Sequence, residues 1–360
     1  HRTSILHPGP VVVPAALAAA EARGASADAF LAAVVRGYEA VIRIGASVGP
    51  GHYALWHNTS TCGPFGAAAA AGALAGLGED ALVWALGNAG TQAAGPWRTR
   101  HEPVMSKQLH TARAAEAGLA AAALAEAGFT GPEFILEGAQ GFYEAMAPDA
   151  TPAAVVDGLE DAPWRIWDVS FKPWPACRHA HPTVDAALAL RARGVDAAEI
   201  AAIRIETYPD AVRFCDRPDP TTEPEAKFSL QHSAATALAE GPPDLETFRS
   251  GALPRAAALR ALAIVEAAEP FASAFPARYG AAVEVRLRSG EVLLEVAADA
   301  LGDPDNPVDE GRLVEKARAL MLDGGRSEAQ ADRLIETALA LHGGGAALDA
   351  FAAALADAPA

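Results

Sequence analysis

Residues 10–160 are dominated by segments rich in alanine and glycine, and this feature most constrains what the chain can fold into. Examples are AALAAAEARG, FGAAAAAGALAGLG and TARAAEAGLAAAALAEAG, which end in glycine. Because alanine and glycine side chains are small, the axes of helices built from them can approach closely. We therefore expect a tightly packed, largely buried helical bundle, stabilised by the density of its contacts more than by large side chains.

Capping and turn residues divide this region into successive helices. Proline is favoured at the start of a helix, serine at the position before it, and glycine just past its end. On these signals we expect one helix opened by Pro14 and ended by Gly24, and further helices over 27–43 after Ser26, after Pro64, over 79–94, and over 107–127 before Gly128.

The pattern changes after Trp164, where segments with alternating apolar residues appear. Residues 201–208 alternate like a strand, and residues 282–296 predict a β-hairpin that turns at Ser289-Gly290. Helical stretches are expected at 182–193, 226–240 and 255–267, and helix returns from Glu310 to about Leu355. A few antiparallel strands among helices are typical of an α+β unit.

These patterns predict a fold that is mainly α with an α+β part. We expect a helical domain at residues 1–165, whose N-terminal part is missing, and an inserted α+β lid domain at 166–308. The C-terminal helices at 309–360 are expected to return to the helical domain. An insertion of this kind can act as a lid over a cleft.

Charge and cysteine content limit the kinds of partner and the cellular compartment that we expect. The formal net charge is −17, which argues against nucleic acid because phosphate binding needs a surplus of lysine and arginine. No apolar stretch is long enough to predict a membrane span. The three cysteines, Cys62, Cys177 and Cys215, form no CxxC pair, which favours a reduced, cytoplasmic compartment. The composition, rich in alanine and arginine, suggests a bacterial source.

Basic side chains in unusual contexts are the candidate site residues of the first half. His7 lies in the turn HPG, and His57 precedes a Gly/Pro turn that leads into an alanine-rich helix, where free N–H groups favour anions. Lys107 lies in a first helical turn, where it opposes the helix dipole and could serve an anionic ligand, and His110 lies one turn further. The alternatives are a hydrogen-bonded histidine in a capping loop and a solvated lysine.

The segment KPWPACRHAHP, residues 172–182, supports two interpretations. Lys172 could bind an anion from a rigid, proline-rich segment. Alternatively, Cys177, His179 and His181 could be metal ligands, since alternate residues of an extended segment share one face. Asp185, one turn past His181, could orient its ring. The chain has no GxGxxG, GxxxxGK[ST], GxSxG or HExxH motif, so nucleotide-cofactor and serine-hydrolase chemistry have no support.

Eight segments, in order along nearly the whole chain, resemble the MmgE/PrpD family, which includes 2-methylcitrate dehydratase, cis-aconitate decarboxylase and iminodisuccinate epimerase. The segments are HPGPVVVPAALAAAE, RGYEAVIRIG, GHYALWHNTSTCGPFGAAAAAGALAGL, SKQLHTARAAEAGLAAAALAEAGFTGP, ILEG, KPWPACRHAHPTVDA, PEAKFSLQHSAATAL and LGDPDNPVDEGRLVEKA. The resemblance implies a helical domain with an inserted α+β lid, a homodimer, and no metal or organic cofactor.

The resemblance also assigns the site. It implies His57, His7, Lys107 and Lys172 as catalytic residues. It places Cys177 and His181 on the lid side of a cleft, and we group them with His110 and Thr59 as substrate-binding residues.

Two departures from the family's pattern stand out. Members carry a further helical stretch upstream, with an Asp and a Thr of the site close before the HP motif, so we expect either a trimmed chain or a degraded homologue. Some members also have a tyrosine after FSLQ where this chain has His232, which weakens any transfer of decarboxylase specificity.

The resemblance implies proton removal next to a carboxylate, with the lysines stabilising the resulting enediolate and His57 and His7 acting on opposite faces of the substrate. We expect a cofactor-independent hydro-lyase acting on 2-methylcitrate, citrate or a related di- or tricarboxylate. The alternatives are a decarboxylase or epimerase of a similar acid, of the cis-aconitate decarboxylase or iminodisuccinate epimerase type, and a non-catalytic degraded homologue.

Overall fold

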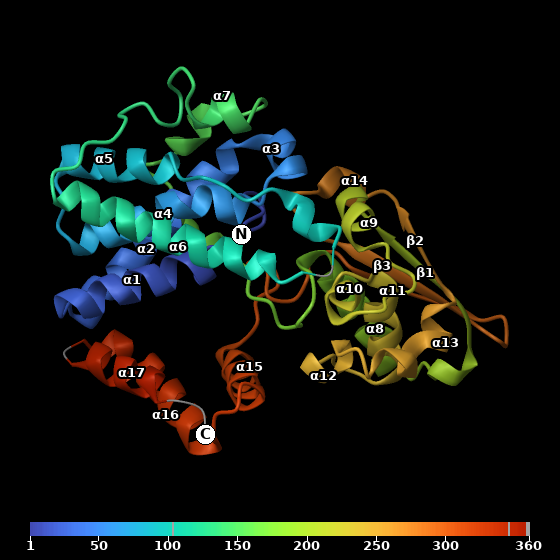
Figure 1. Ribbon diagram of the computed structural model, residues 1–360. Coiled ribbons are helices and arrows are strands. Elements are labelled where there is room, and N and C mark those ends of the chain that lie inside the picture. The colour runs from blue at the N-terminus through green and yellow to red at the C-terminus, as the bar shows by residue number, and fades with distance from the viewer. Residues whose placement is uncertain (103, 345, 358–360) are drawn as a thin grey trace. The chain divides into compact units, whose positions relative to one another are not determined.

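The chain divides into two compact units in the computed structural model, which describes residues 1–102, 104–344 and 346–357 (Figure 1). The helical unit comprises residues 1, 3–169 and 313–360, and the mixed unit comprises residues 2 and 170–312. The mixed unit is therefore inserted, in sequence, between two parts of the helical unit. Together they make a mainly α chain with an α+β part, which confirms the predicted fold class.

The first part of the helical unit holds the helices that the alanine-rich segments predict. They are α1 (Gly9–Arg23), α2 (Ala27–Ser47), α3 (Gly49–Leu55), α4 (Asn58–Leu74), α5 (Glu79–Gly90), α6 (Ser106–Glu126) and α7 (Phe142–Met146). The later helices are α15 (Glu310–Asp323), which begins in the mixed unit, α16 (Glu328–Leu339) and α17 (Ala347–Ala356). Ser26 caps α2 as predicted, because its Oγ accepts the N–H of Ala29.

Two helices begin earlier than the sequence predicts. The helix expected to open at Pro14 starts at Gly9, and the helix expected after Pro64 starts at Asn58, so each proline lies inside a helix. A proline there removes one backbone hydrogen bond. In α4, the residues on both sides of Pro64 are buried along nearly the whole helix, so their packing offsets the lost hydrogen bond.

Helix α4 lies between α2 and α6, and glycines let the three backbones touch (Figure 1). A Cβ atom placed on Gly66 would lie 2.7 Å from Val41 Cβ and 2.8 Å from the carbonyl oxygen of Gly37 in α2. A Cβ on Gly118 of α6 would lie 2.5 Å from the carbonyl oxygen of Pro64 in α4. These separations are shorter than real Cβ contacts, which confirms the close approach predicted from the small residues.

The mixed unit is built on a four-stranded sheet in the order β2-β1-β3-β4. Its strands are β1 (Ile200–Thr207), β2 (Ala263–Ala267), β3 (Ala281–Leu287) and β4 (Val292–Ala297). Strand β1 pairs in parallel with β2 and antiparallel with β3, and β3 and β4 form the predicted hairpin. The helices of this unit are α8 (His181–Ala192), α9 (Pro209–Cys215), α10 (Glu223–Lys227), α11 (Leu230–Ala239), α12 (Leu245–Phe248), α13 (Ala257–Arg260) and α14 (Phe271–Ala274).

Two of the helices expected in this unit are corrected by the structure. The stretch 255–267 is helical only to Arg260, and its second half is strand β2, whose register aligns Ile264 with Arg204 of β1. Pairing with a neighbouring strand outweighs the helical propensity of this alanine-rich stretch. The stretch 226–240 contains a break, because Ser229 caps α11 by accepting the N–H of His232.

Within the described parts of the chain, no helix combines the length and the apolar character that crossing a membrane requires.

The contact between α4 and α6 predicts the effect of a single methyl group. We expect Gly118→Ala to lower the free energy of unfolding by about 1–3 kcal/mol, because the added Cβ would overlap the backbone of α4. Gly311→Ala, on the exposed start of α15, is the matched control and should be neutral or slightly stabilising. Chemical denaturation measures both, and equal stabilities of the two variants would contradict the close packing.

Candidate active site

The candidate site of the helical unit begins where α4 begins. His57 is the residue before α4, and its carbonyl oxygen accepts the N–H groups of Ser60 at 2.7 Å and Thr61 at 3.1 Å. Its own N–H donates to the carbonyl oxygen of Gly95 at 2.9 Å. Gly95 has φ +121°, and a Cβ there would lie 2.5 Å from Ser60 Oγ, so the close approach of the two segments requires glycine. The start of α4 is thereby fixed to the chain segment that carries Trp97.

The imidazole of His57 is enclosed by other rings. Its centroid lies 4.4 Å from the ring of Trp97, 5.4 Å from that of His110 and 6.5 Å from that of His7. Its Nδ1 lies 3.2 Å from Nδ1 of His110. His57 is 1% exposed, and its Nε2 is buried with no hydrogen-bond partner among the described residues. Since buried polar atoms are normally paired, this nitrogen marks the position at which a ligand or substrate would complete the site.

Positive charge surrounds these rings. Lys107 lies in the first turn of α6, and Arg100 ends the short 3-10 helix η1 (Trp97–Arg100) with its guanidinium carbon 3.4 Å from the Trp97 ring centroid. Burial lowers the pKa of His57 to about 2, with smaller contributions from Lys107, from a proton on His110 when that ring is charged, and from Arg100. Burial and Lys107 also lower the pKa of His110. Both rings are therefore neutral at pH 7, beside Lys107 and Arg100.

Thr59 positions His7. The Thr59 hydroxyl is buried and accepts the backbone N–H of His7 at 3.0 Å, which holds the residues before α1 beside the start of α4. The structure thus brings together His7, His57, Thr59, Lys107 and His110, five of the residues that the sequence singles out. Trp97 and Arg100 also belong to this group but were missed, because the segment GPWRTR has no motif and only the fold places it against His57.

The remaining predicted site residues, Lys172, Cys177 and His181, lie in the mixed unit on one short segment. The backbone N–H of Cys177 donates to the carbonyl oxygen of Lys227 at 2.7 Å.

Asp185 does not orient His181 as the sequence suggests. Its two carboxylate oxygens accept the indole N–H of Trp174 at 2.8 Å and the backbone N–H of Leu301 at 2.7 Å.

The metal-ligand interpretation of Cys177, His179 and His181 assumed an extended segment, and the structure shows a helical one. A 3-10 helix, η4 (Arg178–Ala180), leads directly into α8. His179 Nδ1 lies 2.7 Å from the Tyr208 hydroxyl, in a buried aromatic cluster. In the ranges that the structure describes, no group of three or more His, Cys, Asp or Glu side chains is arranged to hold a metal ion.

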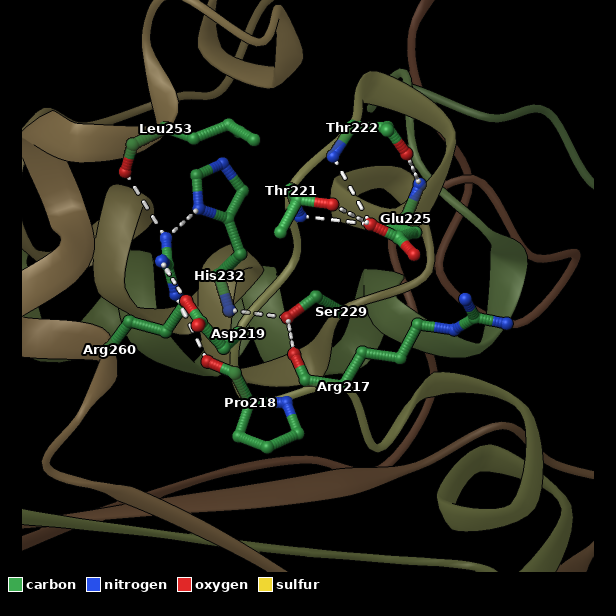
Figure 2. Close-up of polar contacts among 10 residues, drawn as sticks. All are labelled: Arg217, Pro218, Asp219, Thr221, Thr222, Glu225, Ser229, His232, Leu253 and Arg260. Carbon is green, nitrogen blue, oxygen red and sulfur yellow. Dashed lines mark hydrogen bonds and ion pairs between the residues drawn. The ribbon is translucent and has the colours of Figure 1, made fainter. Parts of the chain in front are cut away.

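His232 is buried in the mixed unit, and both of its ring nitrogens have partners. Figure 2 shows one of them, the contact with Arg260. Nε2 of His232 donates to the carbonyl oxygen of Thr247 at 3.1 Å, so Nδ1 is the acceptor for Arg260 at 3.3 Å. Arg260 also donates to the carbonyl oxygen of Pro218 and to Asp219, both at 3.1 Å. His232 therefore anchors, through Arg260, the loop that precedes α10, and its ring nitrogens are already occupied.

Comparisons with known proteins identify relatives for both units. A family model for the MmgE/PrpD N-terminal domain matches residues 1–154, and one for the MmgE/PrpD C-terminal domain matches residues 174–342. Cis-aconitate decarboxylase of Homo sapiens is 29% identical over 277 residues, covering 73% of this chain and 56% of that protein.

Two further relatives carry the same name. Cis-aconitate decarboxylase of Mus musculus is 33% identical over 210 residues, covering 54% of this chain and 41% of that protein. The enzyme of Aspergillus terreus is 31% identical over 209 residues, covering 54% and 42%. The chain thus spans about half the length of the curated relatives that it matches.

The buried neutral histidines predict how stability depends on pH. Folding lowers the pKa of His52, His57 and His232 below the usual value near 6.5, mainly through burial, so the unfolded chain binds more protons below that pH. We expect the free energy of unfolding to fall between pH 7 and 5.5, by up to about 1.4 kcal/mol per pH unit for each such histidine.

His57→Gln should make this dependence shallower, whereas the exposed control Gln108→Ala should not change it. Urea titrations at several pH values measure the slope. A slope that is the same in His57→Gln and in the wild type would contradict the assignment of His57 as a buried neutral group.

Proposed function

The chain belongs to the MmgE/PrpD family, and from that premise we propose that it is a decarboxylase of cis-aconitate or a closely similar tricarboxylate. One observation carries the proposal: the buried Nε2 of His57 has no hydrogen-bond partner among the described residues and lies in a site that holds Lys107 and Arg100. A neutral proton carrier among cations suits a substrate with several carboxylates.

The relatives reported above favour decarboxylation over the dehydration of 2-methylcitrate or citrate expected from the sequence. From the sequence, His232, where some family members have tyrosine, is a reason against decarboxylase specificity. Both ring nitrogens of His232 already bond to protein groups, so this replacement is no argument against a decarboxylase. Both reactions pass negative charge onto carbon and carboxylate, so the same cations serve either one. The dehydratase and the epimerase are therefore the alternative outcomes of the assay below.

Decarboxylation breaks the bond between a carboxylate and its carbon, and CO₂ leaves without the electron pair. In an unsaturated tricarboxylate the pair delocalises over the neighbouring double bond toward a remaining carboxylate. Lys107 and Arg100 stabilise this developing charge, a contribution that is often the largest in catalysis. His57 then supplies a proton at carbon through Nε2, a type of step worth about 10²–10⁴-fold in rate. His7, held by Thr59, faces the same site.

Lys172, Cys177 and His181 stay predictions drawn from the family resemblance, as do the homodimer and the cytoplasmic location. Sedimentation velocity tests the homodimer.

The full-length protein, assayed without added metal, tests the function directly. We expect CO₂ release from cis-aconitate. Release of no CO₂, together with a new ultraviolet absorbance of a conjugated alkene from citrate or 2-methylcitrate, would replace decarboxylation by dehydration. No reaction with any of the three acids, in a folded protein, would overturn both assignments.

Replacement of His57 tests the proton carrier. His57→Gln should lower kcat by at least about 10²-fold, because the amide cannot carry a proton to carbon, while circular dichroism stays native. His342→Gln, at an exposed position in the C-terminal part, is the matched control and should leave kcat unchanged. Turnover in His57→Gln close to that of the wild type would remove His57 from the mechanism.

Lys107 and Arg100 beside His57 predict that a polyanion binds through electrostatic attraction that salt weakens. Calorimetry with the saturated tricarboxylate tricarballylate, at several salt concentrations, measures the affinity. Lys107→Met should weaken binding about tenfold and reduce its dependence on salt. Binding that is independent of salt would contradict this electrostatic description.

A further inference from the structure

The two Nδ1 atoms of His57 and His110 face each other at 3.2 Å. At this separation one nitrogen must carry a proton and the other a lone pair, because two lone pairs repel and two N–H groups collide. Each ring is a neutral imidazole with a single N–H, since burial and nearby cations lower the pKa of both. The direction of this one hydrogen bond therefore fixes the tautomer of both rings.

We propose that His110 is the positioning residue of His57, and that the shared proton between their Nδ1 atoms sets whether Nε2 of His57 acts as a base or as an acid. When His57 donates through Nδ1, its Nε2 carries a lone pair and can accept a proton. When His110 donates, His57 accepts at Nδ1, and its Nε2 carries a proton that it can give to carbon. The catalytic half of this inference rests on the proposed function.

Because the two rings differ in exposure, a proton can pass from solvent through His110 and His57 to the substrate. His57 is 1% exposed and cannot exchange with water through Nε2 once substrate covers it, whereas His110 is partly exposed at the second turn of α6. In the acid direction, Nε2 of His57 gives its proton to the substrate carbon, the Nδ1 proton of His110 moves to Nδ1 of His57, and Nε2 of His110 takes a proton from solvent. In the base direction each of these transfers runs backwards, so the count of protons balances in both.

The titratable and charged side chains around the pair come from three other places in the helical unit. They are His7 from the N-terminal segment, Arg100 from η1 and Lys107 from the first turn of α6. Neither ring has a carboxylate among its hydrogen-bond partners in the described residues. The surroundings therefore disfavour an additional proton on either ring. At neutral pH each ring stays neutral, and one proton lies between the two Nδ1 atoms.

A structural role alone would make His110 a spacer that keeps the His57 ring in place. The two roles differ in a way that can be measured, because a spacer needs no proton and a relay needs one. The test therefore uses one readout that does not depend on turnover and one that does.

The first experiment is nitrogen NMR of the wild-type protein with ¹⁵N-labelled histidine, with spectra of His57→Phe and His110→Asn used for assignment. We expect a ¹⁵N–¹⁵N coupling across the hydrogen bond between the two Nδ1 atoms, and a change in the tautomer of His57 when His110 is replaced. Absence of the coupling, or a tautomer of His57 that is the same with and without His110, would overturn the shared proton whatever the activity of the protein.

The second experiment compares His110→Ala with His101→Ala, the exposed histidine that follows η1, in the decarboxylase assay. We expect His110→Ala to lower kcat by about ten- to a hundredfold, to change KM little, to flatten the pH profile, and to recover activity when imidazole is added. His101→Ala should show none of these effects.

The outcomes separate the two proposals. Full activity of His110→Ala, or a loss that imidazole does not restore, would overturn the relay while wild-type turnover upheld the decarboxylase. A wild-type protein that turns over none of the acids would instead overturn the proposed function, and the coupling across the hydrogen bond would then decide alone whether the histidines share a proton.

Discussion

The close packing of α4 is the constraint on which the rest of the helical unit depends. Glycines at its crossings bring the backbones of α2 and α6 against it, so α4 is buried over most of its length. A helix held in this way has little freedom to tilt, and its N-terminal end is correspondingly fixed. His57 is the residue at that end, and the backbone bond from its N–H to Gly95 ties it to the segment of Trp97 and Arg100. Small residues far from the site thus determine where its central imidazole lies.

Electrostatics in the site run against the charge of the whole chain. The net charge is −17, yet Lys107 and Arg100 lie close to His57, and its hydrogen-bond partner is another neutral histidine. A local group of cations can persist in an acidic protein because low dielectric and short distances outweigh distant, screened charge. Burial, together with the same cations, keeps the histidines neutral, so anion binding and proton transfer involve one set of residues.

Local signals in the sequence predicted much of the fold. Ser26 before an apolar stripe and Ser289-Gly290 between alternating segments identified a helix start and a hairpin turn, and both are present. The strand over 263–267 was missed because its residues pair with β1, 60 residues earlier (Ile203 with Ala263), and no local pattern encodes that partner. The starts of α1 and α4 were placed too late because burial of the residues before each proline, which only the fold creates, outweighs the helix-breaking tendency of proline.

The same distinction holds for the site. Lys107 could be singled out because a lysine in the first turn opposes the helix dipole, His57 because a helix start favours anions, and His110 because it lies one turn past Lys107. Trp97 and Arg100 could not, since their role comes only from contact with His57. The proposed mechanism depends most on the position of His57, and a crystal structure with tricarballylate bound tests that position directly. We predict the ligand within about 3.5 Å of His57 Nε2, with a carboxylate on Lys107. A ligand bound elsewhere, with His57 Nε2 still unpaired, would contradict the central claim.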